Sequence, residues 1–409
     1  MVVLLNMTLR TGIKFRTLAN GCKIRAGFDL SAQEAPSHVT ICNWTQKIGY
    51  YELTRARIKS DGWIIILDHS IQFGKEKIFV VMGILESDYL KLSRPLQYTD
   101  LTPMAIKPDR NWNGSLVSSV INTLIAKYGT IKYAVGDYGS DLKKGMQLSG
   151  IPHIHDLSHL MAIQLKKLFA KDERYIALKS EMSAMRVKFI QTDIAPAVPP
   201  KGRTKSEYHS LDALVKWAEG SLGLVEGTAT GIEKNSILDE EFPDGGVARI
   251  KTALGWICLY KELITELSEI NGAVKEIEKN MKHRSLSRVT IREAEVTLSK
   301  LQSPKGKTVR AIIINELQVQ FDLLADTETV LFSSDILEST FGKYKNRLSE
   351  NPMASVTNLM LIIAAFTLQI TEEAVRECMQ NVKMSDIKTW SDKEIGTSLH
   401  KKRKILYSD

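Results

Sequence analysis

The chain has 409 residues, of which 44% are hydrophobic and 25% are charged, and its formal net charge is +8. This length allows two or three domains with full hydrophobic cores, and the composition excludes a disordered or fibrous protein. The excess of basic over acidic residues favours a polyanionic partner such as nucleic acid.

The apolar stretches and the cysteine spacing exclude several further classes of protein. The longest apolar stretch, 359–366, is far shorter than the roughly 20 residues of a membrane span. The stretch Val2–Leu5 is too short for the hydrophobic region of a signal peptide. We therefore expect a soluble protein that is not exported. No CxxC spacing occurs, which predicts reduced thiols rather than a zinc site or a disulfide framework at Cys22, Cys42, Cys258 and Cys378.

Residues 1–60 contain the pattern of short helices separated by turns that is typical of small DNA-binding modules. Pro36 and Ser37 predict the start of a helix that Gly49 ends. One face would be buried, through Val39, Ile41, Cys42, Thr45 and Ile48. The opposite face would carry polar side chains suited to base edges and phosphates, at Thr40, Asn43, Gln46 and Lys47. A solvated polar face without DNA is the alternative interpretation of the same pattern.

Residues 61–170 change to strands followed by alternating helices and strands. The runs Trp63–Leu67 and Ile78–Met82 are rich in apolar residues suited to strands, and the turn at 74–77 between them indicates a hairpin. The later elements are expected at Thr102–Ile106 (strand), Gly114–Tyr128 (helix), 131–137 (strand), Ser140–Leu148 (helix), Ile151–Ile154 (strand) and Leu157–Phe169 (helix).

Residues 171–325 are predicted to form a helical insertion, and residues 326–409 to complete the core with C-terminal helices and a basic tail. A heptad spacing runs from Trp256 to Ile277, and its short length favours packing inside a helical domain over pairing of two chains. The basic loop 199–205, with Arg203 and Lys205, is a candidate phosphate contact and equally a solvated linker.

Three acids occupy informative places: Asp68 follows the first strand's apolar run, Asp137 ends the fourth strand, and Glu338 lies on a late helix. Cleavage of a phosphodiester bond through two divalent cations needs carboxylate ligands of this kind. Asp68 would bridge the two ions, and Asp137 and Glu338 would hold one each. A carboxylate after so many large apolar residues is costly unless it is paired, which favours a functional role for Asp68.

Each acid has a competing interpretation. Asp137 precedes a Tyr-Gly-Ser turn and could begin the next helix, so Asp141 and Asp156 are alternatives for the second ligand. Asp156 is more readily understood as a helix cap. Glu338 shares a helix with a basic group that would hold the phosphate backbone or would form a plain surface charge pattern: Lys343, Lys345 and Arg347.

These residues resemble the DDE transposases of bacterial insertion sequences, which have an RNase H-like core. The matching segments are Trp63–Gly83, Gly136–Leu142, His155–His159 and Ile336–Lys345. The resemblance implies a mixed α/β fold in which the helical insertion precedes Glu338, and it implies that the three acids bind two Mg²⁺ or Mn²⁺ ions. In one branch of that family a Tyr and an Arg precede the glutamate, whereas Leu331 and Ser334 stand there in this chain.

The resemblance further implies a transposase that hydrolyses a strand at the ends of its element and transfers the 3′-hydroxyl to target DNA. Its partners would be the terminal inverted repeats, target DNA and a second copy of the chain, in the bacterial cytoplasm at the nucleoid. Two other classes remain open. One is a DNA-binding regulator without catalysis that derives from a transposase, and the other is a metal-dependent nuclease without strand transfer.

Overall fold

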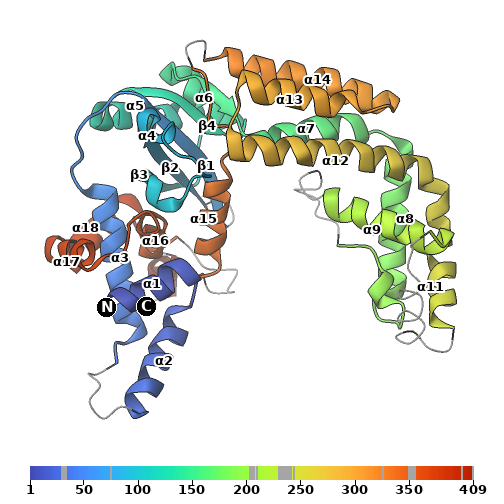
Figure 1. The fold of residues 1–409 in the computed structure, drawn as a ribbon. Helices are drawn as coiled ribbons and strands as arrows, with labels where there is room; N and C mark the ends of the chain where they lie inside the picture. The colour runs from blue at the N-terminus through green and yellow to red at the C-terminus, as the bar shows by residue number, and fades with distance from the viewer. Residues whose placement is uncertain are drawn as a thin grey trace. The chain divides into compact units, whose positions relative to one another are not determined.

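The computed structural model describes residues 1–28, 35–73, 76–201, 208, 211–228, 242, 245–324, 327–348, 356–397 and 399–407. The chain forms two compact units: unit 1 comprises Met1–Asp156 and Leu331–Asp409, and unit 2 comprises Leu157–Val330. Unit 1 is mixed α/β and unit 2 is helical (Figure 1). The helical insertion thus begins at Leu157 rather than at 171, because helix α7 (Leu157–Phe169) packs against α12 and α14 of unit 2.

Unit 1 is built on a five-stranded mixed sheet of order β3-β2-β1-β4-β5. Strands β1, β2 and β3 are antiparallel neighbours, while β1, β4 and β5 run parallel. The weakly indicated third strand is confirmed, and β1 extends well beyond the predicted end at Leu67. The strands are β1 (Trp63–Phe73), β2 (Glu76–Leu85), β3 (Thr102–Asp109), β4 (Ile131–Gly136) and β5 (His153–His155).

One face of the sheet is covered by α5 (Gly114–Tyr128) and α6 (Ser140–Ser149). Asn113 starts α5 by accepting a hydrogen bond from the Leu116 amide at 3.0 Å, and Gly129 ends it with a φ of +107°. Alternation along β1 turns Ile65 and Leu67 into this layer. The residues buried together here include Trp63, Phe79, Val81, Val117, Ile121, Leu124, Ala134 and Met146.

Helices from both ends of the chain pack on other parts of the sheet. Helix α3 (His38–Thr54) and α16 (Ile362–Ala365) contact β3, and α15 (Asp335–Lys345) contacts β1. Helix α3 does not end at Gly49, as the sequence predicted, but continues to Thr54. A Cβ at position 49 would overlap the Leu361 carbonyl, so the glycine allows α3 to approach the segment at 358–365 closely.

The other described elements of unit 1 are α1 (Val2–Thr11), α2 (Phe15–Phe28), α4 (Glu86–Tyr89), η1 (Tyr98–Asp100), η5 (Asn358–Leu361), α17 (Glu372–Asn381), α18 (Met384–Glu394) and α19 (Leu399–Tyr407). The N-terminal helices are bound to the C-terminal segment: Arg10 donates to the carbonyls of Phe366 at 3.0 Å and Leu368 at 2.6 Å. Helix α3 packs against α2, α16, α17 and α18. Residues 1–60 therefore fold as part of unit 1.

Unit 2 consists of helices that pack around α12 (Lys261–Arg284). The predicted heptad seam is buried inside this unit from Leu263 to Ile277, which confirms the interpretation as packing within one domain. The other described elements are α8 (Glu173–Phe189), η2 (Ala195–Ala197), α9 (Leu211–Glu226), α11 (Gly246–Leu254), η4 (Gly255–Tyr260), α13 (Arg288–Ser299) and α14 (Pro304–Asp322). Within the described ranges of the whole chain, no helix is both long and apolar enough to cross a membrane.

Candidate active site

Asp68 and Asp137 lie side by side where strands β1 and β4 separate. The parallel pairing of these strands runs up to Ile66 opposite Val135. Two residues further on each strand, the same register places Asp68 opposite Asp137. The Leu67 carbonyl supports this register, because a Cβ on Gly136 would stand only 2.5 Å from its oxygen. Both aspartates are half-buried.

The Asp68 carboxylate projects from the face of the sheet that α5 and α6 leave open. Ile65 and Leu67 point into the core beneath α5, so alternation directs Asp68 to the opposite face. Asp137 follows the last residue of β4, and its carboxylate lies close enough to His69 to affect the pKa of that side chain. Helix α15, which carries Glu338 in its first turn, packs on β1.

Backbone amides orient the two aspartates. The His69 amide donates to Asp68 Oδ1 at 2.5 Å, and the Gly139 amide donates to Asp137 Oδ1 at 3.2 Å. Asp137 therefore takes part in the turn before α6, as the competing interpretation held. A carboxylate has two oxygens and several lone pairs, so this contact leaves capacity for a ligand.

Asp141, an alternative second ligand, is engaged on the other face of β1. Its Oδ2 lies 3.1 Å from His69 Nε2 and 4.0 Å from Lys77 Nζ. The His69 ring packs against Phe79 and Trp112, with ring centres 5.0 and 5.3 Å away. Burial lowers the pKa of His69. Asp141 thus fixes the start of α6 to β1, and we do not retain it as a ligand.

Asp156, the other alternative, is buried at 1% exposure after β5. Its Oδ2 accepts hydrogen bonds from the Ser334 amide at 2.7 Å and from Ser334 Oγ at 2.9 Å. The sequence favoured a capping role for Asp156 at its own helix. The structure also places its carboxylate at the start of the distant helix α15, because Ser334 immediately precedes that helix.

Glu338 lies in the first turn of α15 and is exposed. The opposite side of this helix is buried through Leu337, Thr340, Phe341 and Tyr344. Lys345 is exposed as well, seven residues further along. Two turns of helix bring residues of this spacing back to the same face, as predicted.

The other two basic residues of this group, Lys343 on α15 and Arg347 just after it, are engaged within the protein. Lys343 Nζ lies 3.9 Å from the centre of the Tyr98 ring. Arg347 donates to the hydroxyl of Thr8 at 2.7 Å and to the Thr8 carbonyl, and burial lowers the pKa of Arg347 to about 10. Arg347 therefore joins the end of α15 to α1, which corrects its expected role as a phosphate contact.

The three acids do not form one ligand group in this conformation. Among the residues that the structure describes, no three His, Cys, Asp or Glu side chains stand close enough to hold a metal ion. Asp68 and Asp137 are in register, and Glu338 is on the helix beside them. The donor chemistry of the aspartate pair fits a hard divalent cation, whereas the third ligand is not in place.

The proposed recognition face of α3 is half-buried. Thr40, Asn43, Gln46 and Lys47 are all of intermediate exposure, and Gln46 donates to Cys42 Sγ at 3.2 Å. Val39, expected on the buried face, is 52% exposed. Ser37 starts the helix as predicted, by accepting a hydrogen bond from the Thr40 amide at 3.1 Å. The candidate loop residues Arg203 and Lys205 lie outside the described residues.

A basic surface on α2 and the turn before it was not predicted from the sequence. Residues 1–28 contain no Asp or Glu, and four of their basic side chains are exposed: Lys14, Arg16, Lys23 and Arg25. The three-residue turn begins at Gly12, whose φ is +82°. A small core of Leu18, Ala19 and Ile41 joins α2 to α3. The absence of acids in this segment was the signal that could have identified it.

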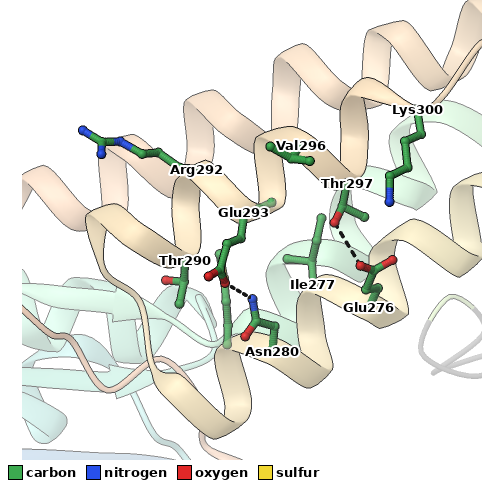
Figure 2. Close-up of a pocket in the computed structure, with 11 residues that line it drawn as sticks. Glu276, Ile277, Asn280, Thr290, Arg292, Glu293, Val296, Thr297 and Lys300 are labelled. Carbon is green, nitrogen blue, oxygen red and sulfur yellow. Dashed lines mark hydrogen bonds between the residues drawn. The ribbon is translucent and has the colours of Figure 1, made fainter.

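A groove between α12 and α13 in unit 2 is shown in Figure 2. Its acids are engaged in helix packing: Thr297 donates to Glu276 at 3.1 Å, and Asn280 donates to Glu293 at 2.6 Å. Arg284 also pairs with Glu293 at 2.6 Å. These contacts hold α13 against α12, and we assign the groove no ligand.

Comparisons with known proteins add a distant structural likeness. No protein-family model matches the chain, and no curated protein matches it. The Drosophila P element transposase strand transfer complex resembles it with a TM-score of 0.39 and 11% sequence identity, over 91% of this chain and 97% of that chain. A TM-score below 0.5 at this identity establishes neither the family nor the activity of the chain.

Proposed function

We propose that the protein is a DNA transposase, which hydrolyses a strand at the ends of its own element and joins the freed 3′-hydroxyl to target DNA. The observation that carries the proposal is the placement of Asp68 and Asp137 directly after the paired segments of β1 and β4. Two neighbouring carboxylates repel each other unless a bound cation or a substrate group offsets their charge. The strand order, which is that of an RNase H-like sheet, also supports it.

The aspartate pair is proposed to hold Mg²⁺ or Mn²⁺, and Glu338 to complete a two-ion site when metal and DNA are bound. Such ions, when bound, make a water or hydroxyl nucleophilic and stabilise the leaving oxygen. The amides of His69 and Gly139 orient the two aspartates before any ligand binds. Lys345 is proposed to hold a backbone phosphate next to the one that is cut.

DNA binding is proposed to use the basic surface of α2 and the turn before it rather than the polar face of α3. Lys14, Arg16, Lys23 and Arg25 are exposed without any acid in their segment, so a phosphate backbone meets no opposing charge from residues 1–28. We propose that the first two helices and the glycine-containing turn act as a helix-turn-helix; their short connection supports this.

A cleavage and joining assay tests the proposal. The full chain is incubated with Mg²⁺ and a duplex carrying the DNA that flanks its gene, together with a supercoiled plasmid as target. A transposase nicks the flanking DNA and joins its 3′-hydroxyl end to the plasmid. Nicking without joining would identify a nuclease, and binding without metal-dependent nicking would identify a regulator.

A further inference from the structure

The buried carboxylate of Asp156 links the strand that precedes Asp137 to the helix that carries Glu338. The Asp156 amide donates to the Gly136 carbonyl at 2.8 Å, and Gly136 is the residue before Asp137. On its other side, Asp156 Oδ2 accepts both the amide and the hydroxyl of Ser334. These bonds connect positions 178 residues apart in the sequence. Burying a carboxylate is costly unless hydrogen bonds satisfy it. The buried Asp156 carboxylate therefore requires its hydrogen bonds from Ser334.

The start of α15 needs such a partner. The amides in the first turn of a helix have no acceptor within the helix, and Ser334 makes no side-chain cap of its own. A negative charge at this end also interacts favourably with the helix dipole. A second buried side chain holds the preceding segment, because the Leu331 amide donates to the Tyr133 hydroxyl of β4 at 2.8 Å. The segment that precedes α15 is therefore fixed at two points, to Tyr133 of β4 and to Asp156 after β5.

We propose that Asp156 is a positioning residue for the reaction: its carboxylate anchors the first turn of α15, from which Glu338 reaches the aspartate pair when metal and DNA are bound. Glu338 lies four residues after Ser334, which is about 6 Å along the helix axis. A shift of the first turn of α15 would move Glu338 with it. This inference rests on the proposed function, since it assumes that Glu338 acts beside the aspartate pair. It assigns Asp156 a role through α15 instead of direct metal ligation.

The activity test compares Asp156→Ala with Asp156→Asn in the full chain. Asp156→Ala removes both hydrogen bonds to Ser334, and a misplacement of about 1 Å far from the chemistry can lower the rate by roughly 10²-fold. We expect that loss in kcat with an unchanged KM for DNA. Asp156→Asn keeps an oxygen acceptor and should recover most of the rate, whereas an amide in place of a metal ligand should not. Equal inactivity of the two variants would overturn the positioning role.

A matched control separates loss of position from loss of stability. Asp172 starts α8 in unit 2 by accepting the Arg174 amide at 2.9 Å, so it is also a capping carboxylate. Asp172→Ala should lower stability but leave kcat of the folded protein unchanged. An equal fall in kcat for Asp172→Ala and Asp156→Ala would show a general effect of destabilisation and would overturn the inference.

Hydrogen exchange gives a measurement that does not depend on catalysis. In Asp156→Ala without metal or DNA, amides of the first turn of α15 should exchange faster, while those of α5 keep their wild-type rates. Unchanged exchange at α15 would overturn the inference whatever the activity. A wild-type chain that cleaves no DNA would instead overturn the proposed function. Ser334→Ala, which removes one of the two bonds, should show a smaller change of the same kind if Asp156→Ala does not fold.

Discussion

Helices α3 and α15 make an instructive comparison, because each carries polar residues that the sequence assigned to DNA. On α15, Glu338 and Lys345 are exposed and the apolar residues face the core. On α3, all four polar candidates are half-buried between helices from both ends of the chain. A polar stripe therefore identifies a functional face only where no later segment covers it. Contacts from residues beyond 355 decide which of the two helices keeps its polar face open.

The largest effect is expected from the acids on and beside α15. Asp68→Asn, Asp137→Asn and Glu338→Gln each keep the side-chain size but remove a charged ligand, and each should lower Mg²⁺-dependent cleavage by orders of magnitude. DNA binding in a gel-shift assay should stay close to wild type. Rates are measured by following strand cleavage of flanking DNA at saturating enzyme.

Asp141→Asn is the matched control for these acids. Asp141 is close to Asp137 in sequence, but it contacts His69 on the opposite face of β1. We expect it to retain most of the cleavage rate. Loss of cleavage in Asp141→Asn together with a normal rate in Asp137→Asn would move the second ligand to Asp141 and would contradict the proposed site.

The covered position of α3 predicts a large effect on stability at Gly49. A Cβ there would overlap the Leu361 carbonyl, and overpacking of this kind costs about 1–3 kcal/mol of unfolding free energy. Gly21 on α2 is the matched control, since nothing lies within 4 Å of its added Cβ. Gly21→Ala should stabilise the helix by up to about 1 kcal/mol. Urea unfolding followed by circular dichroism measures both, and a neutral Gly49→Ala would show that α3 does not pack closely.

A smaller effect distinguishes the exposed surface of α2 from the half-buried face of α3. Lys23→Ala should reduce the slope of log binding constant against log salt by roughly 0.9, because one phosphate contact is lost. Lys47→Ala on α3 should leave that slope unchanged. Fluorescence anisotropy with end DNA over a range of salt measures both variants. The reverse pattern would return DNA recognition to α3.

Local patterns and long-range contacts were not equally predictable from the sequence. The run Trp63–Leu67 and the cap of α5 at Asn113 depend on neighbouring residues, so the strand and the helix were predictable. Gly49 was misread as a helix end, because only the distant Leu361 backbone explains it. The hydrogen bonds of Asp156 to Ser334 were not predictable either, because Ser334 lies across the whole insertion. Which acids share a face likewise depends on the register of β1 and β4, which no local pattern contains.

The smallest effect concerns Lys345. This side chain is exposed, whereas the polar candidates on α3 are half-buried. It lies seven residues after Glu338, about 10 Å along the helix axis, which is too far for a metal ligand but suits a neighbouring phosphate. Loss of one exposed charge contact should cost about 1 kcal/mol, roughly a fivefold fall in binding and in cleavage at subsaturating DNA. Lys345→Arg keeps the charge and should restore part of both.

Lys343 provides the control on the same helix, because its ammonium group lies over the Tyr98 ring. Lys343→Ala removes this cation–π contact and should lower stability more than DNA affinity. If Lys345→Ala cleaves and joins DNA at the wild-type rate under subsaturating conditions, the exposed face of α15 does not meet the substrate. Glu338 would then have to reach the aspartate pair by a rotation of α15, and the hydrogen bonds between Asp156 and Ser334 would have to break in the active complex.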